Sequence, residues 1–216
     1  MKNILALVLL CFASNCYGAV IYLGVGVNSK AKGDDDYAPE ITELSGILQP
    51  QKKKLILGHD VTVKNVILGL EWLVDTAVDH DLVIVYIAAH GHFDGKYSFS
   101  GWKEYIYGSL ISNYINQVKG KIVVIVDTCH SGGILREYWR KGIQVYTSCG
   151  EDEYSWGRFY CEQLYDKLRR YSIFEVQKHI LGDARQSPKS LASGSITVMT
   201  SPSTTSHRFQ YVFQSE

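Results

Sequence analysis

The sequence lacks the features that would indicate a nucleic-acid partner, a membrane span or a repeat architecture. It carries 22 Lys and Arg residues against 22 Asp and Glu residues, so no bulk attraction to nucleic acid or anionic lipid is expected. No apolar run reaches the roughly 18 residues that a membrane-spanning helix needs. Internal repeats are absent, and only four prolines interrupt the 216 residues. We therefore expect one globular domain, with no nucleic-acid partner and no membrane span.

The first 18 residues differ in composition from the rest of the chain. Lys2 precedes an apolar run from Ile4 to Ala13, and small and polar residues follow as far as Gly18. This order is typical of a secretory signal peptide. We therefore expect residues 1–18 to be a signal peptide, residues 19–216 to form the functional domain, and the mature protein to be secreted or periplasmic. A buried first strand or helix of a cytosolic protein is the alternative.

Cysteine is scarce, and cleavage after Gly18 would leave only Cys129, Cys149 and Cys161. An odd number of cysteines in an exported protein suggests one free thiol and one disulfide. Cys149 and Cys161 could form that disulfide, or they could be two buried thiols. A free thiol in an oxidising compartment needs a function, so Cys129 becomes a candidate for chemistry.

Short apolar runs alternate with helical patterns along the chain. The expected strands are residues 19–27, 54–57, 82–89, 121–126, 142–147, 196–199 and 209–213. The expected helices are residues 40–48, 63–77 after an N-cap at Thr62, 109–118, 159–170 and 173–181, the last opened by Ser172 and Glu175 as a capping box. Strands that are apolar on both faces and alternate with helices predict an α/β fold. Its sheet would be mostly parallel, with helices on both faces.

Two of these strands end in reactive side chains. The strand at 82–89 runs into HGH (90–92), and the strand at 121–126 runs into DTCHSGG (127–133). Ligands bind beyond the carboxyl ends of parallel strands, so neighbouring strands would bring His90 and Cys129 into one crevice. An imidazole near a thiol can take its proton and later protonate a leaving amine. We predict that Cys129 is a nucleophile and His90 its acid/base partner.

The glycines of these segments fit the same chemistry. Gly91 has no side chain to shield its N–H, which with the N–H of Cys129 would form an oxyanion hole. Gly132 and Gly133 permit a sharp exit from the nucleophile loop. His130 is next to the nucleophile, but adjacent side chains diverge in an extended loop, so we expect a structural role for it.

The segments VIVYIAAHGH (83–92) and IVVIVDTCHSGG (122–133) resemble the two catalytic motifs of the caspase/metacaspase family of cysteine peptidases. The nucleophile loop resembles the metacaspase type, and the resemblance covers most of the chain between residue 19 and about residue 181. It implies a caspase-like α/β/α sandwich, a dyad of His90 and Cys129, and protein or peptide substrates. It also implies that the chemical step needs no metal or other cofactor.

The resemblance further implies a pocket for the P1 residue of the substrate. In metacaspases an aspartate two positions before the nucleophile lines this pocket, and the P1 residue is arginine or lysine. Asp127 has that position here, and Glu40 matches an aspartate of the first helix. A carboxylate binds a guanidinium or ammonium and repels an acidic side chain, so we expect cleavage after Arg or Lys. Glu40 could instead be a helix N-terminal acid that the macrodipole favours.

The sequence also departs from the metacaspase pattern. Ala88-Ala89 replaces the Ser-Gly that metacaspases usually carry before the catalytic histidine, and the resemblance implies that the missing serine would line the specificity pocket. Acidic residues for regulatory calcium are not recognisable, and Arg136 lies seven positions past Cys129. Calcium activation therefore has no support in the sequence.

Two alternatives from other functional classes stay open. A metal-dependent hydrolase could use His90, His92, Asp127 and His130, which are the ligand types that zinc takes at strand ends. That alternative leaves Cys129 without a role. The other alternative is a catalytically silent caspase-like domain that only binds partners.

Overall fold

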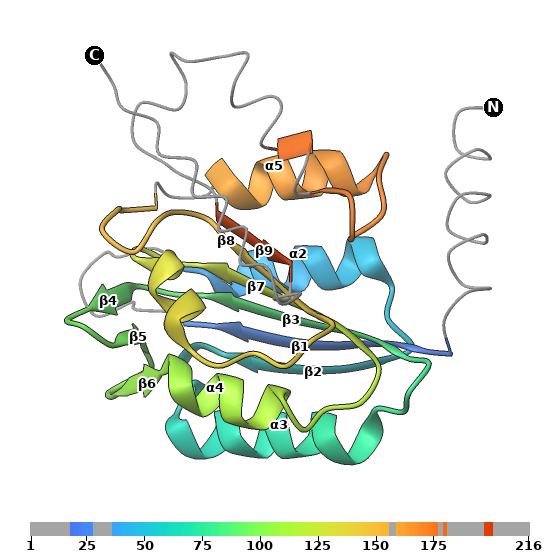
Figure 1. The fold of residues 1–216 in the computed structure, drawn as a ribbon, viewed down its shortest axis with the longest axis horizontal. Helices are drawn as coiled ribbons and strands as arrows, with labels where there is room; N and C mark the ends of the chain where they lie inside the picture. The colour runs from blue at the N-terminus through green and yellow to red at the C-terminus, as the bar shows by residue number, and fades with distance from the viewer. Residues whose placement is uncertain (1–17, 28–35, 156–158, 177–178, 181–196, 201–216) are drawn as a thin grey trace.

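A computed structural model describes residues 18–27, 36–155, 159–176, 179–180 and 197–200. Its centre is a six-stranded sheet in the order β2-β1-β3-β7-β8-β9 (Figure 1). These strands are Val20–Gly26 (β1), Lys52–Leu57 (β2), Leu82–Ala88 (β3), Lys121–Asp127 (β7), Ile143–Thr147 (β8) and Thr197–Thr200 (β9). The first five in chain order pair in parallel, and β9 pairs antiparallel with β8. The predicted mostly parallel sheet is confirmed.

Helices cover both faces of this sheet (Figure 1). The helices α3 (Val63–Thr76) and α4 (Gly108–Ile115) lie on one face. The helices α2 (Ala38–Leu48) and α5 (Phe159–Leu168) lie on the other. The predicted α/β/α sandwich is therefore also confirmed.

The two faces of the sheet build two separate hydrophobic cores. Along β3, Val83, Val85 and Ile87 pack into the core with α3 and α4. Ile84 and Tyr86 pack into the core with α2 and α5. Successive strand side chains point to opposite faces, which explains the alternation. Asp127 continues the alternate positions of Val123 and Ile125, and this places it on the α2/α5 side at the end of β7.

The predicted elements are present where the structure describes them, but several of their ends differ. The helix α2 begins at Ala38 and not at Glu40, and α4 ends at Ile115 and not at Val118. Thr62 caps α3, since its hydroxyl accepts a hydrogen bond from the Asn65 N–H at 3.2 Å. At the start of the predicted helix at 173–181, the Ser172 hydroxyl donates to a carboxylate oxygen of Glu175 at 2.8 Å. That helix is described only in part. The predicted strand at 209–213 and residues 1–17 of the predicted signal peptide lie outside the described residues.

A second sheet was not predicted. Its antiparallel strands are Gly91–Phe93 (β4), Tyr97–Ser100 (β5) and Tyr105–Tyr107 (β6). It lies beyond the carboxyl ends of the parallel strands (Figure 1). The buried side chains of Tyr97, Phe99 and Ile106 attach it to the α3/α4 core. Because β4 begins directly after His90, and the Ser100 N–H donates to the His90 carbonyl at 2.8 Å, this sheet holds the backbone of His90.

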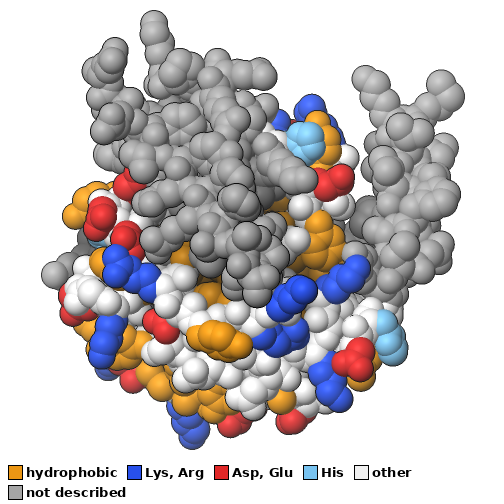
Figure 2. Space-filling view, viewed as in Figure 1, with side chains coloured by type: hydrophobic (Ala, Val, Ile, Leu, Met, Phe, Trp, Pro, Cys, Tyr) orange, Lys and Arg blue, Asp and Glu red, His pale blue; other side chains and the backbone are white. Residues whose placement is uncertain are grey.

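The described surface carries charged side chains of both signs, together with hydrophobic ones, on the face that Figure 2 shows. Within the described ranges, no helix combines the length and the apolar character that crossing a bilayer requires.

Candidate active site

The strand register brings the two predicted catalytic residues to the same edge of the sheet. In the parallel pair of β3 and β7, Ala88 lies opposite Asp127. His90 and Cys129 each come two residues after this pair, so they have equivalent positions beyond adjacent strands. The Ala89 N–H continues the pairing with a hydrogen bond to the Asp127 carbonyl at 3.4 Å. The two strands that the sequence analysis expected to lie side by side are neighbours, as that prediction required.

Gly91 makes direct backbone contact with the nucleophile loop. A Cβ atom added at Gly91 would lie 1.8 Å from the Cys129 carbonyl oxygen and 2.6 Å from the Thr128 hydroxyl oxygen. No side chain fits there, which gives Gly91 a packing role besides the exposed N–H that the sequence predicted. The segment after His90 and the loop that carries Cys129 are thus fixed against each other.

Hydrogen bonds hold the residues on both sides of Cys129. The Thr128 hydroxyl donates to the Cys129 carbonyl at 2.9 Å and accepts from the buried Tyr97 hydroxyl at 2.7 Å. The Ser131 hydroxyl accepts from the Cys149 N–H at 3.1 Å and donates to the Cys149 carbonyl at 3.2 Å. Buried polar groups that are fully paired favour one conformation, so the nucleophile loop is well positioned.

The suggested disulfide between Cys149 and Cys161 is not present, and the two residues are separate buried thiols. Cys149 packs under the nucleophile loop, where its thiol donates to the Thr128 carbonyl at 3.2 Å. Burial raises the pKa of Cys149 to about 11, which keeps it protonated and unreactive. Cys161 lies on α5, in the core on the opposite face from α3. The alternative of two buried thiols is the correct one.

Ser155 connects Cys129 to Asp127. The thiol of Cys129, which is half-buried, points to the Ser155 carbonyl oxygen at 3.7 Å. The Ser155 hydroxyl donates to Oδ1 of Asp127 at 3.1 Å. The sequence analysis missed Ser155, because nothing in its local pattern shows that the loop after β8 turns back to the end of β7.

The three histidines near the nucleophile have different surroundings. His90 is half-buried, and its ring makes an edge contact with Tyr37 at 5.5 Å between centroids. His92 lies 3.0 Å from the Ser100 hydroxyl. Burial, and then the charges of His90 and His130, lower the pKa of His92.

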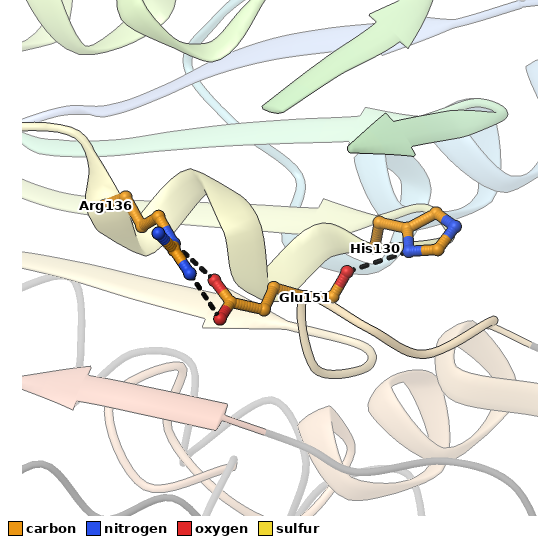
Figure 3. Close-up of polar contacts among 3 residues, drawn as sticks. All are labelled: His130, Arg136 and Glu151. Atoms are coloured by element: carbon orange, nitrogen blue, oxygen red, sulfur yellow. Dashed lines mark hydrogen bonds and ion pairs between the residues drawn. The ribbon is translucent and has the colours of Figure 1, made fainter. Parts of the chain in front are cut away.

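His130 has the structural contacts expected of it. It has a left-handed backbone, with φ of 56°. Its Nδ1 lies 2.8 Å from the Glu151 carbonyl oxygen (Figure 3). Its ring makes an edge contact with Tyr154. The Glu151 carboxylate holds Arg136 through two hydrogen bonds of 2.5 and 2.7 Å (Figure 3). Glu151 thus ties both ends of the turn Ser131–Arg136 to the loop after β8.

Glu40, Asp127 and Cys161 form a buried group that we call the acidic cluster. One donor atom of each lies within 4.8 Å of the others. Glu40 is 2 % exposed and Asp127 is 4 % exposed. The structure thus brings together the two carboxylates that the sequence assigned to the P1 pocket. It adds Cys161, for which the sequence had left open a disulfide or a buried thiol.

Burial raises the pKa of Asp127 to about 6, and hydroxyl groups of Ser148, Ser155 and Tyr86 that face the carboxyl group limit this increase. Ser155 bonds to Oδ1. In the described part of the chain, Oδ2 of Asp127 and the Tyr86 hydroxyl have no hydrogen-bond partner of good geometry. Buried polar atoms without a partner are rare in native proteins, and they mark a place where a ligand could bind.

The zinc-hydrolase alternative does not fit this geometry. The acidic cluster is the one group of three or more metal-type donors that converges among the described residues, and it contains no histidine. Asp127 points to the α2/α5 side, whereas His92 contacts Ser100 and His130 contacts Glu151. The predicted set of His90, His92, Asp127 and His130 is therefore not assembled, because neighbouring strand-end side chains diverge.

Comparisons with known proteins place the chain in a family. The model of the peptidase C13 family matches residues 52–210, which is most of the chain. The crystal structure of protein GSU0716 from Geobacter sulfurreducens has a similar fold, with a TM-score of 0.66 and 13 % identity. The match covers 85 % of this chain and 94 % of that one. The search of curated proteins found no match. The predicted relation to caspase-like peptidases is confirmed, and the chain belongs to the peptidase C13 family, a family of the caspase-like clan of cysteine peptidases.

Proposed function

We propose that this protein is an exported cysteine endopeptidase that uses Cys129 and His90 and cleaves after Arg or Lys. The observation that carries the proposal is the register of β3 and β7. It gives His90 and Cys129 equivalent positions beyond adjacent strands, with Gly91 packed on the Cys129 carbonyl.

In the proposed reaction, His90 takes the proton of the Cys129 thiol, and the sulfur attacks the carbonyl carbon of the scissile bond. The N–H groups of Gly91 and Cys129 stabilise the negative oxygen that forms. Among the described residues, none accepts a hydrogen bond from the Cys129 N–H, which supports this role. His90 then protonates the leaving amine, and water hydrolyses the acyl-enzyme.

The acidic cluster supports the proposed preference for a basic P1 residue. Oδ2 of Asp127 is buried and has no hydrogen-bond partner among the described residues, and the neighbouring Glu40 adds a second carboxyl group. A guanidinium would supply both positive charge and hydrogen-bond donors in a planar arrangement. Lysine would supply a single charged group and should be a weaker substrate. An acidic P1 residue would place a third carboxylate beside two others.

Peptide reporters that differ only at P1 test this preference. We expect kcat/KM to be highest for arginine, lower for lysine and lowest for aspartate. Iodoacetamide should abolish the activity and EDTA should not affect it. Highest activity with asparagine or aspartate would contradict the role of the acidic cluster and leave the dyad standing. Activity that survives alkylation of Cys129 would contradict the dyad itself.

Export is part of the proposal, and the surroundings of residue 19 support it. The Ala19 backbone nitrogen lies 2.8 Å from Oδ1 of Asp81, and Asp81 is buried. Cleavage after Gly18 would convert this nitrogen into an α-ammonium group beside a carboxylate that already accepts from it. N-terminal sequencing of protein from the native host should find Ala19 first. A chain that retains Met1 would contradict export by this route.

A further inference from the structure

We propose that Glu40, Asp127 and Cys161 form a binding site for a zinc ion. The three residues come from separate elements: the first turn of α2, the last residue of β7 and the first turns of α5. Their donor atoms lie within 4.8 Å of one another. Donors of a tetrahedral zinc ion, at bond lengths of about 2.0–2.3 Å, are about 3.5 Å apart. Side-chain movements of about 1 Å would therefore complete the site.

A second observation points to a ligand at this position. Oδ2 of Asp127 is buried and has no hydrogen-bond partner of good geometry in the described part of the chain, and the same is true of the Tyr86 hydroxyl on the adjacent strand. Asp127 has no ion pair with any described cation. An ionised carboxylate without a partner is costly to bury, and a bound cation would remove that cost.

The donor types select among the metals. Calcium and magnesium take oxygen ligands, so a thiol among the donors disfavours them. Zinc binds both cysteine sulfur and carboxylate oxygen, and three protein ligands leave its fourth position for water. A copper(I) ion would prefer more sulfur than one cysteine supplies. A thiolate with two carboxylates therefore fits zinc best.

The site coincides with the residues proposed to bind the P1 side chain, so its effect on activity rests on the proposed function. A zinc ion between Glu40 and Asp127 would neutralise the carboxylates that attract arginine, and it would fill the space that the guanidinium needs. Zinc should therefore inhibit competitively against a substrate with arginine at P1. The metal site itself does not depend on catalysis.

Cobalt(II) is a spectroscopic probe of this site, because a cysteine ligand gives it a near-ultraviolet charge-transfer band. The titration uses the full chain with Cys129→Ala, which removes the nucleophile as a competing ligand. We expect one equivalent of cobalt to produce the band and zinc to displace it. Adding Cys161→Ser should abolish the band. Adding Cys149→Ser should not, because serine preserves the hydrogen-bond donor at Cys149 and this residue lies outside the cluster.

Asp127→Asn, in the same Cys129→Ala background, provides a second test. It preserves the shape of the side chain and should weaken zinc binding at least tenfold, with circular dichroism verifying the fold of each variant. A cobalt band that survives Cys161→Ser, or no binding in the Cys129→Ala protein, would overturn the metal site. Zinc that binds this cluster without competing with an arginine substrate would instead overturn the assignment of the cluster to P1, and the metal site would stand.

Discussion

The nucleophile loop and the acidic cluster lie at the end of the same strand, β7, but they differ in whether their buried polar atoms have hydrogen-bond partners. In the loop, the side-chain oxygens of Thr128 and Ser131 each have two or more hydrogen-bond partners. In the cluster, one carboxylate oxygen of Asp127 and the neighbouring Tyr86 hydroxyl have none among the described residues.

This difference separates two physical tasks. A nucleophile needs a fixed position, and paired buried groups provide it at a modest gain in stability. A binding site for a cation needs charge that the protein itself does not neutralise, and this lowers stability until the ligand arrives. We infer that the loop is built to hold Cys129 and that the cluster is built to receive a ligand.

The largest expected effect is on kcat, and it tests the proposed catalytic roles of Cys129 and His90. Cys129→Ala should lower kcat by about 10³-fold or more, since the covalent step disappears. His90→Ala should be nearly as severe, and circular dichroism should show an unchanged fold for both. His130→Ala is the control, because its side chain contacts Glu151 and Tyr154, and it should lose much less activity. Equal losses at His130 and His90 would contradict the assigned base.

Gly91→Ala tests the contact between the two segments of the site. Its Cβ would meet the Cys129 carbonyl at 1.8 Å, so the backbone must move, at a cost of about 3 kcal/mol or more in the free energy of unfolding. Gly46→Ala is the matched control, because a Cβ there meets nothing within 4 Å inside α2, and it should stabilise the protein by about 0.5–1 kcal/mol. Urea denaturation measures both. A Gly91→Ala protein of unchanged stability and activity would show that the contact between Gly91 and the Cys129 carbonyl does not fix the two segments against each other.

Asp127→Asn tests whether burial of the ionised Asp127 carboxylate lowers the free energy of unfolding. EDTA is present to exclude metals. The folded-state pKa is about 6, against an ordinary value of 3.8. The folded protein thus holds its proton more tightly than the unfolded chain, so stability falls as pH rises from about 4 to about 6 and stays low above it. The difference corresponds to at most about 3 kcal/mol. The variant should therefore be more stable than the parent at pH 7.5, with little gain at pH 4.

Melting temperatures across this pH range provide the measurement, and Ser155→Ala is a useful companion variant. Removing the hydrogen bond that Ser155 donates to Asp127 should raise the folded-state pKa further and enlarge the pH effect. If Asp127→Asn destabilises the protein at every pH, burial of the Asp127 carboxylate does not lower the stability of the protein.

Thr128→Val has the smallest expected effect and tests the hydrogen bonds of the Thr128 hydroxyl in the nucleophile loop. The exchange preserves shape but leaves the buried Tyr97 hydroxyl without its partner, at a cost of about 1–3 kcal/mol. The double variant with Tyr97→Phe should recover part of that loss, because both polar partners are then absent. A double-mutant cycle with no coupling energy would contradict the network.

The sheet, and the positions of His90 and Cys129 beyond adjacent strands, could be predicted from the sequence for a specific reason. The runs at 82–89 and 122–126 are apolar throughout, as strands buried on both faces require. His90 follows the first run directly, and Cys129 lies three residues after the second. The second sheet was missed although Tyr97-Ser98-Phe99-Ser100 alternates as a strand does, because four residues are a weak signal.

The acidic cluster could be predicted only in part. The resemblance to metacaspases pointed to Asp127 and Glu40, and the structure brings them together. Cys161 and Tyr86 could not be assigned, because their proximity depends on how α5 packs across the sheet. The disulfide prediction failed for the same reason: counting cysteines says nothing about which face of the sheet each one lies on.

The most direct test of the account is covalent labelling with a peptide electrophile that carries arginine at P1, followed by intact-mass and peptide mapping. We predict one adduct per chain, located on Cys129, with much slower labelling of His90→Ala and of Asp127→Asn proteins. The same electrophile with aspartate at P1 should label slowly. An adduct on Cys149 or Cys161, or equal labelling by the arginine and aspartate probes, would contradict the account.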